Sequence, residues 1–75
     1  MPLIEVKMIE KVFAPAQKKE IITKLTDALV EIEGEALRPY TVVLLEDVHS
    51  GSWGVGGKGL TTEDVLALQA QKKIS

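Results

Sequence analysis

The segment from residue 15 to residue 33 most constrains the fold of this chain, because it is an amphipathic helix pattern between two strand patterns. Its apolar residues recur at helical spacing, and its charged residues lie mostly outside that stripe. The apolar stripe consists of Ile21, Ile22, Leu25, Ala28, Leu29 and Ile32. Pro15 suits a first helical turn, where a missing N–H costs nothing, and Gly34 is a typical C-terminal stop. The pattern predicts one helix from about Pro15 to Glu33.

The flanking segments have strand patterns of two kinds. From Pro2 to Ile9 the chain alternates in polarity, which is typical of a strand with one face on a core. Ile4, Val6 and Met8 share one face of it, and Leu3, Glu5 and Lys7 share the other. Residues 41–45 (TVVLL) form a continuous apolar run, which favours a strand covered on both faces and bounded by Glu46 and Asp47. With a loop over residues 10–14, the order is a β-α-β unit of parallel strands.

The remaining residues predict a hairpin and a short helix. Residues 50–58 are too rich in glycine for a helix and indicate a tight hairpin or a bulged loop. We expect Gly54, Gly56 and Gly57 to adopt positive φ there. Thr61, with Asp64 three residues later, resembles a helix cap. The predicted fold is therefore α+β: a single domain over residues 1–75 with a β-α-β unit, a C-terminal hairpin and a short helix.

The amino-acid composition argues against several classes of function. Nine basic and eleven acidic residues nearly cancel and form no basic cluster, which argues against a nucleic-acid partner. Cysteine is absent, so thiolate chemistry and disulfides are excluded. No apolar run approaches a membrane span and no signal-peptide pattern is present, so we expect a cytoplasmic protein without a membrane partner. Two strands and one long helix cannot cover their own apolar faces, which predicts an obligate homo-oligomer whose sheets extend each other.

Pro2 is a candidate catalytic residue because a proline at the N-terminus carries a secondary amine. Once Met1 is removed, that nitrogen can act as a general base, a general acid or a nucleophile, mounted on the first residue of a strand. If Met1 is retained, the nitrogen belongs to an amide and has no basic lone pair. The alternative is that Pro2 only protects the N-terminus.

These features together resemble the 4-oxalocrotonate tautomerase family. The resemblance rests on Pro2 opening a strand, the helix containing Gln17–Glu20, the strand over residues 41–45 and the segment Gly51–Gly57 (GSWGVGG), and it extends to about Lys58. It implies a β-α-β subunit, dimers with a four-stranded sheet, and usually a hexamer built as a trimer of dimers. It also implies an isomerase without cofactor or metal, in which Pro2 shuttles a proton between the enol and keto forms of an unsaturated 2-hydroxy (2-oxo) acid. In this family an aromatic residue at the place of Trp53 forms an apolar wall beside the proline; packing alone is the alternative for Trp53.

The chain departs from the family at two substrate-binding positions. Members acting on dicarboxylates hold them with two arginines, and here Val12 or a neighbour in the loop occupies the first place and Val42 the second. Arg38 and Lys11 are the candidate replacements for binding a carboxylate, and a solvated surface charge is the alternative for each. A less charged pocket favours a monoacid enol, such as an aryl or alkyl enolpyruvate, over a diacid.

Other residues and functions remain open. His49 has no carboxylate or second histidine at ligand spacing, and it is interpreted as a turn or surface residue. Tyr40 is either a hydroxyl donor to the enolate or a ring packed at a subunit contact. The competing functions are hydration or dehalogenation of an unsaturated acid on the same fold, and a non-catalytic oligomeric subunit. Pro2→Ala separates the enzymes from the subunit, since it abolishes turnover and spares assembly only if the proline is catalytic.

Overall fold

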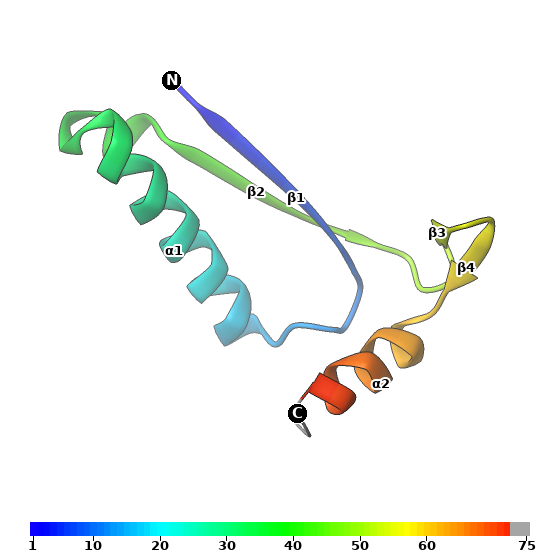
Figure 1. Cartoon of the computed structure of the whole chain (residues 1–75). Helices are drawn as coiled ribbons and strands as arrows, with labels where there is room; N and C mark the ends of the chain where they lie inside the picture. The colour runs from blue at the N-terminus through cyan, green and yellow to red at the C-terminus, as the bar shows by residue number, and fades with distance from the viewer. Residues whose placement is uncertain (73–75) are drawn as a thin grey trace. The chain divides into compact units, whose positions relative to one another are not determined.

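A computed structural model describes residues 1–72 and shows seven elements (Figure 1). In order they are β1 (Leu3–Ile9), α1 (Pro15–Glu33), the 3-10 helix η1 (Glu35–Tyr40), β2 (Val42–Val48), β3 (Trp53–Val55), β4 (Lys58–Leu60) and α2 (Thr62–Lys72). The chain divides into two compact units. The first joins Met1–Val6 to Phe13–Glu46, and the second joins Lys7–Val12 to the chain from Asp47 onward.

Strands β1 and β2 pair in parallel, as the sequence predicts. The Val42 N–H donates to the carbonyl oxygen of Pro2 at 3.1 Å, and the Glu10 N–H donates to that of Val48 at 2.9 Å. The start of β1 thus meets the start of β2, and the two ends meet as well. With α1 between them in the chain, this is the predicted β-α-β layout.

Helix α1 begins and ends where the sequence predicts. Pro15 occupies the first turn, and the preceding Ala14 N–H donates to Gln17 Oε1 at 2.8 Å. At the other end Gly34 adopts φ 105° and its N–H donates to the Val30 carbonyl at 2.8 Å. A positive φ is accessible to glycine at little steric cost, which explains the stop.

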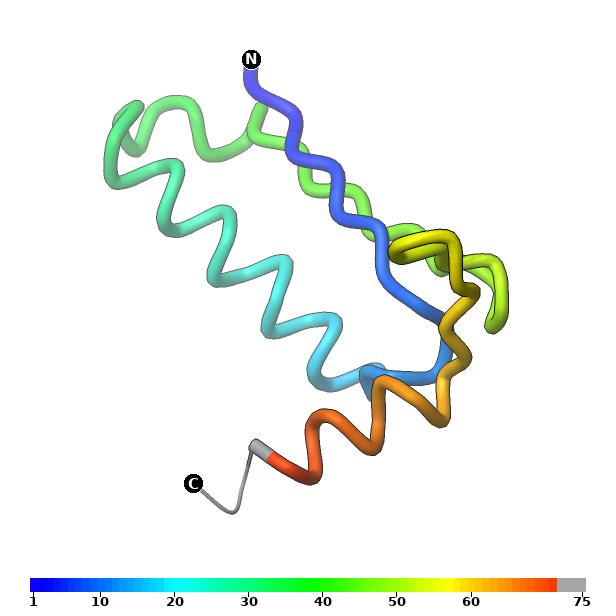
Figure 2. The backbone as a smooth tube through the Cα atoms, turned by 45° about the vertical axis from the view of Figure 1, so that its right-hand side comes forward, coloured from blue at the N-terminus to red at the C-terminus, as the bar shows by residue number. Residues whose placement is uncertain are grey.

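The first unit buries one face of its two strands against α1, which lies alongside them in Figures 1 and 2. Val30 of the helix is only 4% exposed. The strand residues on the covered face are half-buried: Ile4, Val6, Val43 and Leu45. On the opposite face Leu3, Val42 and Leu44 remain 54%, 39% and 43% exposed. The prediction that the second strand is covered on both faces is therefore not met within this chain, since one helix can cover only one face. Ile22 and Ile32 of the predicted apolar stripe are exposed too.

Two features between α1 and the hairpin differ from the predictions. Residues 35–40 form η1, which was not predicted because Pro39 suggested only a boundary. Strand β2 does not stop before Glu46 and Asp47 but continues to Val48. The charged pair lies on exposed positions of the strand.

In the second unit β3 and β4 form the predicted hairpin, with Trp53 opposite Leu60. Gly56 and Gly57 occupy its two-residue turn at φ 60° and 83°. Both central residues at positive φ are the requirement of a type I′ turn, whose twist matches that of paired strands. The prediction for Gly54 is wrong: it lies within β3, and Gly51 has the additional positive φ. A strand residue pairs in the extended conformation and has no need of positive φ.

Helix α2 begins with the predicted cap. The Thr61 N–H donates to Asp64 Oδ2 at 2.9 Å, and the Asp64 N–H donates to Thr61 Oγ1 at 3.2 Å. These reciprocal bonds satisfy two backbone donors at the start of the helix. The hydrogen bond from the Thr61 backbone lowers the pKa of Asp64 below its ordinary value, and the Thr61 hydroxyl adds to the shift.

This cap makes a pH-dependent contribution to stability. Because the pKa of Asp64 is lower in the folded than in the unfolded chain, its stabilisation is present above about pH 4 and is lost as the pH falls further. We expect Asp64→Asn to keep the acceptor oxygen but to lack the charge. Thermal melting from pH 7 to pH 2.5 should show the gap between wild type and Asp64→Asn closing below pH 4; parallel curves would contradict the assignment.

Candidate active site

Pro2 lies directly before β1 and is half-buried. Its carbonyl oxygen accepts the hydrogen bond from Val42 N–H, so the residue is fixed at the start of the strand pair. Proline has no backbone N–H to donate in a chain, and its nitrogen is therefore not committed to the ladder. The first unit thus holds the candidate catalytic residue on a rigid element.

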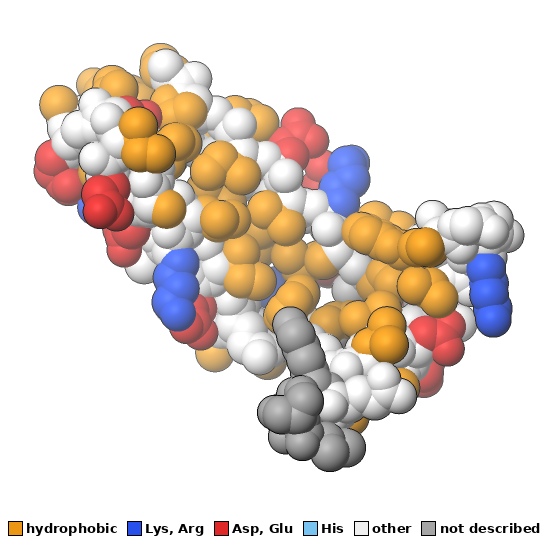
Figure 3. All heavy atoms as spheres, in the orientation of Figure 1, with side chains coloured by type: hydrophobic (Ala, Val, Ile, Leu, Met, Phe, Trp, Pro, Cys, Tyr) orange, Lys and Arg blue, Asp and Glu red, His pale blue; other side chains and the backbone are white. Residues whose placement is uncertain are grey.

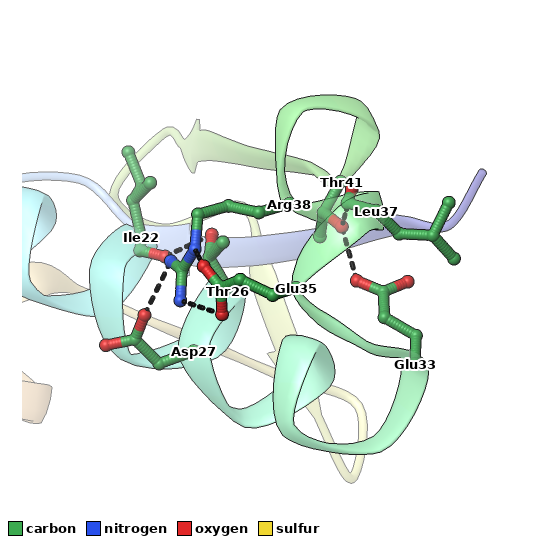
Figure 4. A network of polar contacts seen from close by, with 8 residues as sticks. All are labelled: Ile22, Thr26, Asp27, Glu33, Glu35, Leu37, Arg38 and Thr41. Atoms are coloured by element: carbon green, nitrogen blue, oxygen red, sulfur yellow. Dashed lines mark hydrogen bonds and ion pairs between the residues drawn. The ribbon is translucent and has the colours of Figure 1, made fainter.

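Arg38 lies on η1 and is held by two carboxylates of the first unit (Figure 4). Its Nε lies 2.6 Å from Glu35 Oε1, and its Nη1 lies 2.8 Å from Asp27 Oδ1. The hydrogen bonds that Arg38 donates to Glu35 and, as the second cause, to Asp27 raise the pKa of Arg38, and the bond from Arg38 lowers the pKa of Glu35. One cation thus faces two anions, so a substrate carboxylate would have to compete with both.

Hydrogen bonds in the same region also fix Thr41, the residue directly before β2. The Thr41 hydroxyl lies within hydrogen-bond distance of Glu33 Oε2 and, at 3.0 Å, of the Leu37 carbonyl oxygen (Figure 4). Together with Arg38, Thr41 ties η1 to the adjacent part of α1. Tyr40, at the end of η1, is 53% exposed, which leaves both of its predicted roles open.

Lys11 belongs to the second unit and has an unusual backbone. Its φ of 63° is the left-handed conformation, which is uncommon for a residue with a Cβ and costs roughly 1–2 kcal/mol. The side chain is exposed, and its ammonium has no ion-pair partner among residues 1–72. Among residues 1–72, Arg38 is thus neutralised by two carboxylates, and Lys11 is not paired with any.

The left-handed conformation predicts a reversed order of stability between two substitutions. Glycine tolerates positive φ, whereas alanine keeps the steric cost that lysine carries. We expect Lys11→Gly to be more stable than Lys11→Ala by about 0.5–1 kcal/mol. Chemical denaturation of the two variants measures the difference; an equal or lower stability of Lys11→Gly would show that φ is not positive in solution.

A polar cluster beside Lys11 was not predicted. The Glu10 carboxylate accepts the Ser50 N–H at 2.9 Å, and His49 Nδ1 lies 3.1 Å from the same oxygen, Oε2. His49 is a surface residue, as predicted, with its side chain 80% exposed, and the fold brings the Glu10 carboxylate to it from a distant part of the sequence. Glu10 follows β1 and His49 follows β2, so the ends of two parallel strands bring them together.

Trp53 is the first residue of β3 and is half-buried opposite Leu60. The candidate residues are thus distributed over both units: Pro2 and Arg38 lie in the first, and Lys11 and Trp53 lie in the second. Within residues 1–72 no group of three or more His, Cys, Asp or Glu side chains could hold a metal ion. Over the same residues no helix is long and apolar enough to cross a membrane.

A β-α-β chain with Pro2 before its first strand and a Gly-rich hairpin after its second is the layout of the tautomerases. The profile of the family described as tautomerase enzyme matches residues 2–63, and the chain belongs to that family. The resemblance found in the sequence is thereby confirmed.

The chain is similar to a protein of known sequence and to a solved structure. The chain is 31% identical over 61 residues to a probable tautomerase K2 of Dickeya dadantii (strain 3937), an alignment covering 81% of this chain and 90% of the relative. It is also similar to the crystal structure of a 4-oxalocrotonate tautomerase homologue, with a TM-score of 0.69 and 26% identity over 85% of this chain and 95% of that one. The similarity to that structure supports the fold described above.

Proposed function

We propose that this chain is a cofactor-independent tautomerase of the 4-oxalocrotonate tautomerase type. It interconverts the enol and keto forms of an unsaturated 2-hydroxy (2-oxo) acid, with Pro2 as the N-terminal residue of the active protein. The observation that carries the proposal is the family match beginning at Pro2, which stands at the head of β1. The similarity to tautomerases supports an isomerase of this family.

The proposed reaction needs one group that takes a proton and returns it. With Met1 removed, the Pro2 nitrogen is a secondary amine, and it accepts the proton of the enol hydroxyl or delivers one to carbon. General acid–base catalysis works best when the group's pKa lies near the working pH, and apolar surroundings bring an amine toward that range by disfavouring its charged form. Trp53 is the residue proposed to supply the apolar wall.

The substrate class follows from the residues available to bind a carboxylate. Val12 or a neighbour in the loop stands where the family's dicarboxylate enzymes have the first arginine, and Val42 stands at the place of the second. Arg38 is engaged by Asp27 and Glu35. Lys11 is the remaining candidate cation, and a single ammonium suits a monoacid. We therefore propose an aryl or alkyl enolpyruvate as substrate, with Lys11 or Arg38 on its carboxylate.

The test is the ketonisation of phenylenolpyruvate, followed by ultraviolet absorbance. Protein purified with Met1 retained is compared with the same sample after methionine aminopeptidase treatment, and mass spectrometry confirms the removal. We expect turnover above the buffer rate only after Met1 is removed, because an amide nitrogen has no basic lone pair. Equal rates before and after removal would exclude Pro2 as the catalytic base.

A further inference from the structure

Two hydrogen bonds fix both peptide groups that flank Glu10. On one side the Glu10 N–H donates to the Val48 carbonyl oxygen at 2.9 Å. On the other side Thr62 Oγ1 donates to the Glu10 carbonyl oxygen at 2.7 Å. The second peptide group also contains the nitrogen of Lys11, so its orientation determines the φ of Lys11.

Thr62 is itself held in place. It is only 5% exposed, and its N–H donates to Ser50 Oγ at 2.9 Å. The Ser50 N–H in turn donates to the Glu10 carboxylate. Glu10, Ser50 and Thr62 therefore form a closed ring of hydrogen bonds, which we call the Glu10 ring. All of its members lie in the second unit with Lys11.

The Glu10 ring holds the peptide group that precedes Lys11, which is the one non-glycine residue with positive φ among residues 1–72. Residues persist in such conformations where their surroundings over-determine them, and these places cluster at ligand-binding sites. We infer that Thr62 is a positioning residue: its bond to the Glu10 carbonyl holds Lys11 in the left-handed conformation in which the ammonium binds the substrate carboxylate. This inference rests on the proposed function for its substrate class. The second observation that supports it is that Lys11 has no ion-pair partner in the described part of the chain (residues 1–72), whereas Arg38 has two.

The experiment uses Thr62→Val, which keeps the side-chain shape and removes the hydroxyl donor. Thr62→Ser restores that donor and is the rescue variant. Thr26→Val is the matched control, because Thr26 Oγ1 also donates to a backbone carbonyl at 2.7 Å, that of Ile22 in α1. The probes are phenylpyruvate and its methyl ester, which lacks the negative charge. Titration calorimetry gives their affinities, and ketonisation of phenylenolpyruvate gives kcat and KM.

We expect Thr62→Val to weaken phenylpyruvate binding by roughly three- to fivefold, the effect of one solvent-exposed ion pair, and to leave the ester unchanged. KM should rise by a similar factor with kcat retained. The backbone chemical shifts of Lys11 should move, whereas Thr62→Ser and Thr26→Val should behave as wild type. Combining Thr62→Val with Lys11→Ala should cost no more than Lys11→Ala alone, since both remove one interaction.

Two results would overturn the inference. One is a Thr62→Val protein that is folded and binds phenylpyruvate as tightly as wild type. The other is an equal loss of acid and ester binding, which would mean a structural role for Thr62 only. Absence of turnover in the wild type would instead refute the proposed function, and the binding measurements would still decide the role of Thr62.

Discussion

Replacing Pro2 with alanine is expected to lower kcat/KM for phenylenolpyruvate by about 10²–10⁴-fold, the range typical of a lost general acid or base. Alanine also leaves a free amine after Met1 removal, but a primary one that rotates about the N–Cα bond, whereas the pyrrolidine ring of proline fixes the orientation of the nitrogen. The lone pair then has neither the basicity of a secondary amine nor the fixed orientation that the proline ring gives it. Steady-state kinetics over pH 5–9 measure the loss.

Assembly and stability are the controls for this substitution. The contact that fixes residue 2 uses its backbone carbonyl, which accepts the Val42 N–H and is present in alanine too. Pro2→Ala should therefore melt close to wild type and sediment identically. A variant that is active at the wild-type rate would remove Pro2 from the mechanism. If the variant is inactive because it is unfolded, its melting curve will show the unfolding.

The elements of the fold could be predicted because their signals are local. Pro15 and Gly34 mark the ends of α1, Gly56 and Gly57 mark the turn, and Thr61 with Asp64 marks the start of α2. The 3-10 helix η1 has no periodic signal of its own in six residues. It is linked to α1 by Arg38, which reaches back to Asp27, eleven residues earlier.

The candidate site was harder to predict because its contacts are distant in sequence. Glu10 meets His49 and Ser50 some forty residues away, where the ends of two parallel strands share one edge. The predicted β-α-β order could have indicated that these residues lie close together. The positive φ of Lys11 was not, because lysine has no preference for that conformation and only tertiary contacts impose it.

One face of the β1–β2 strand pair is not covered within the chain, and we expect a substitution on it to change oligomer assembly. Hydrophobic side chains can be seen at the surface in the view of Figure 3. Large apolar residues are exposed in the first unit. On the strands they are Leu3, Val42 and Leu44. A two-stranded sheet with one covered face is marginal alone. We propose that a second copy of the chain covers this face, in a dimer or a hexamer.

We therefore expect Leu44→Glu to dissociate the assembly, raising its dissociation constant by at least about 100-fold. Burying a leucine contributes roughly 1.5–3 kcal/mol, and enclosing an unpaired carboxylate adds a penalty of several kcal/mol in each copy. Leu44→Met is the matched control, because it conserves volume and apolar surface and should assemble as wild type does. Sedimentation equilibrium at micromolar concentration gives the constants for all three proteins. A wild-type monomer, or a Leu44→Glu oligomer of unchanged affinity, would mean that this strand face is not where the copies meet.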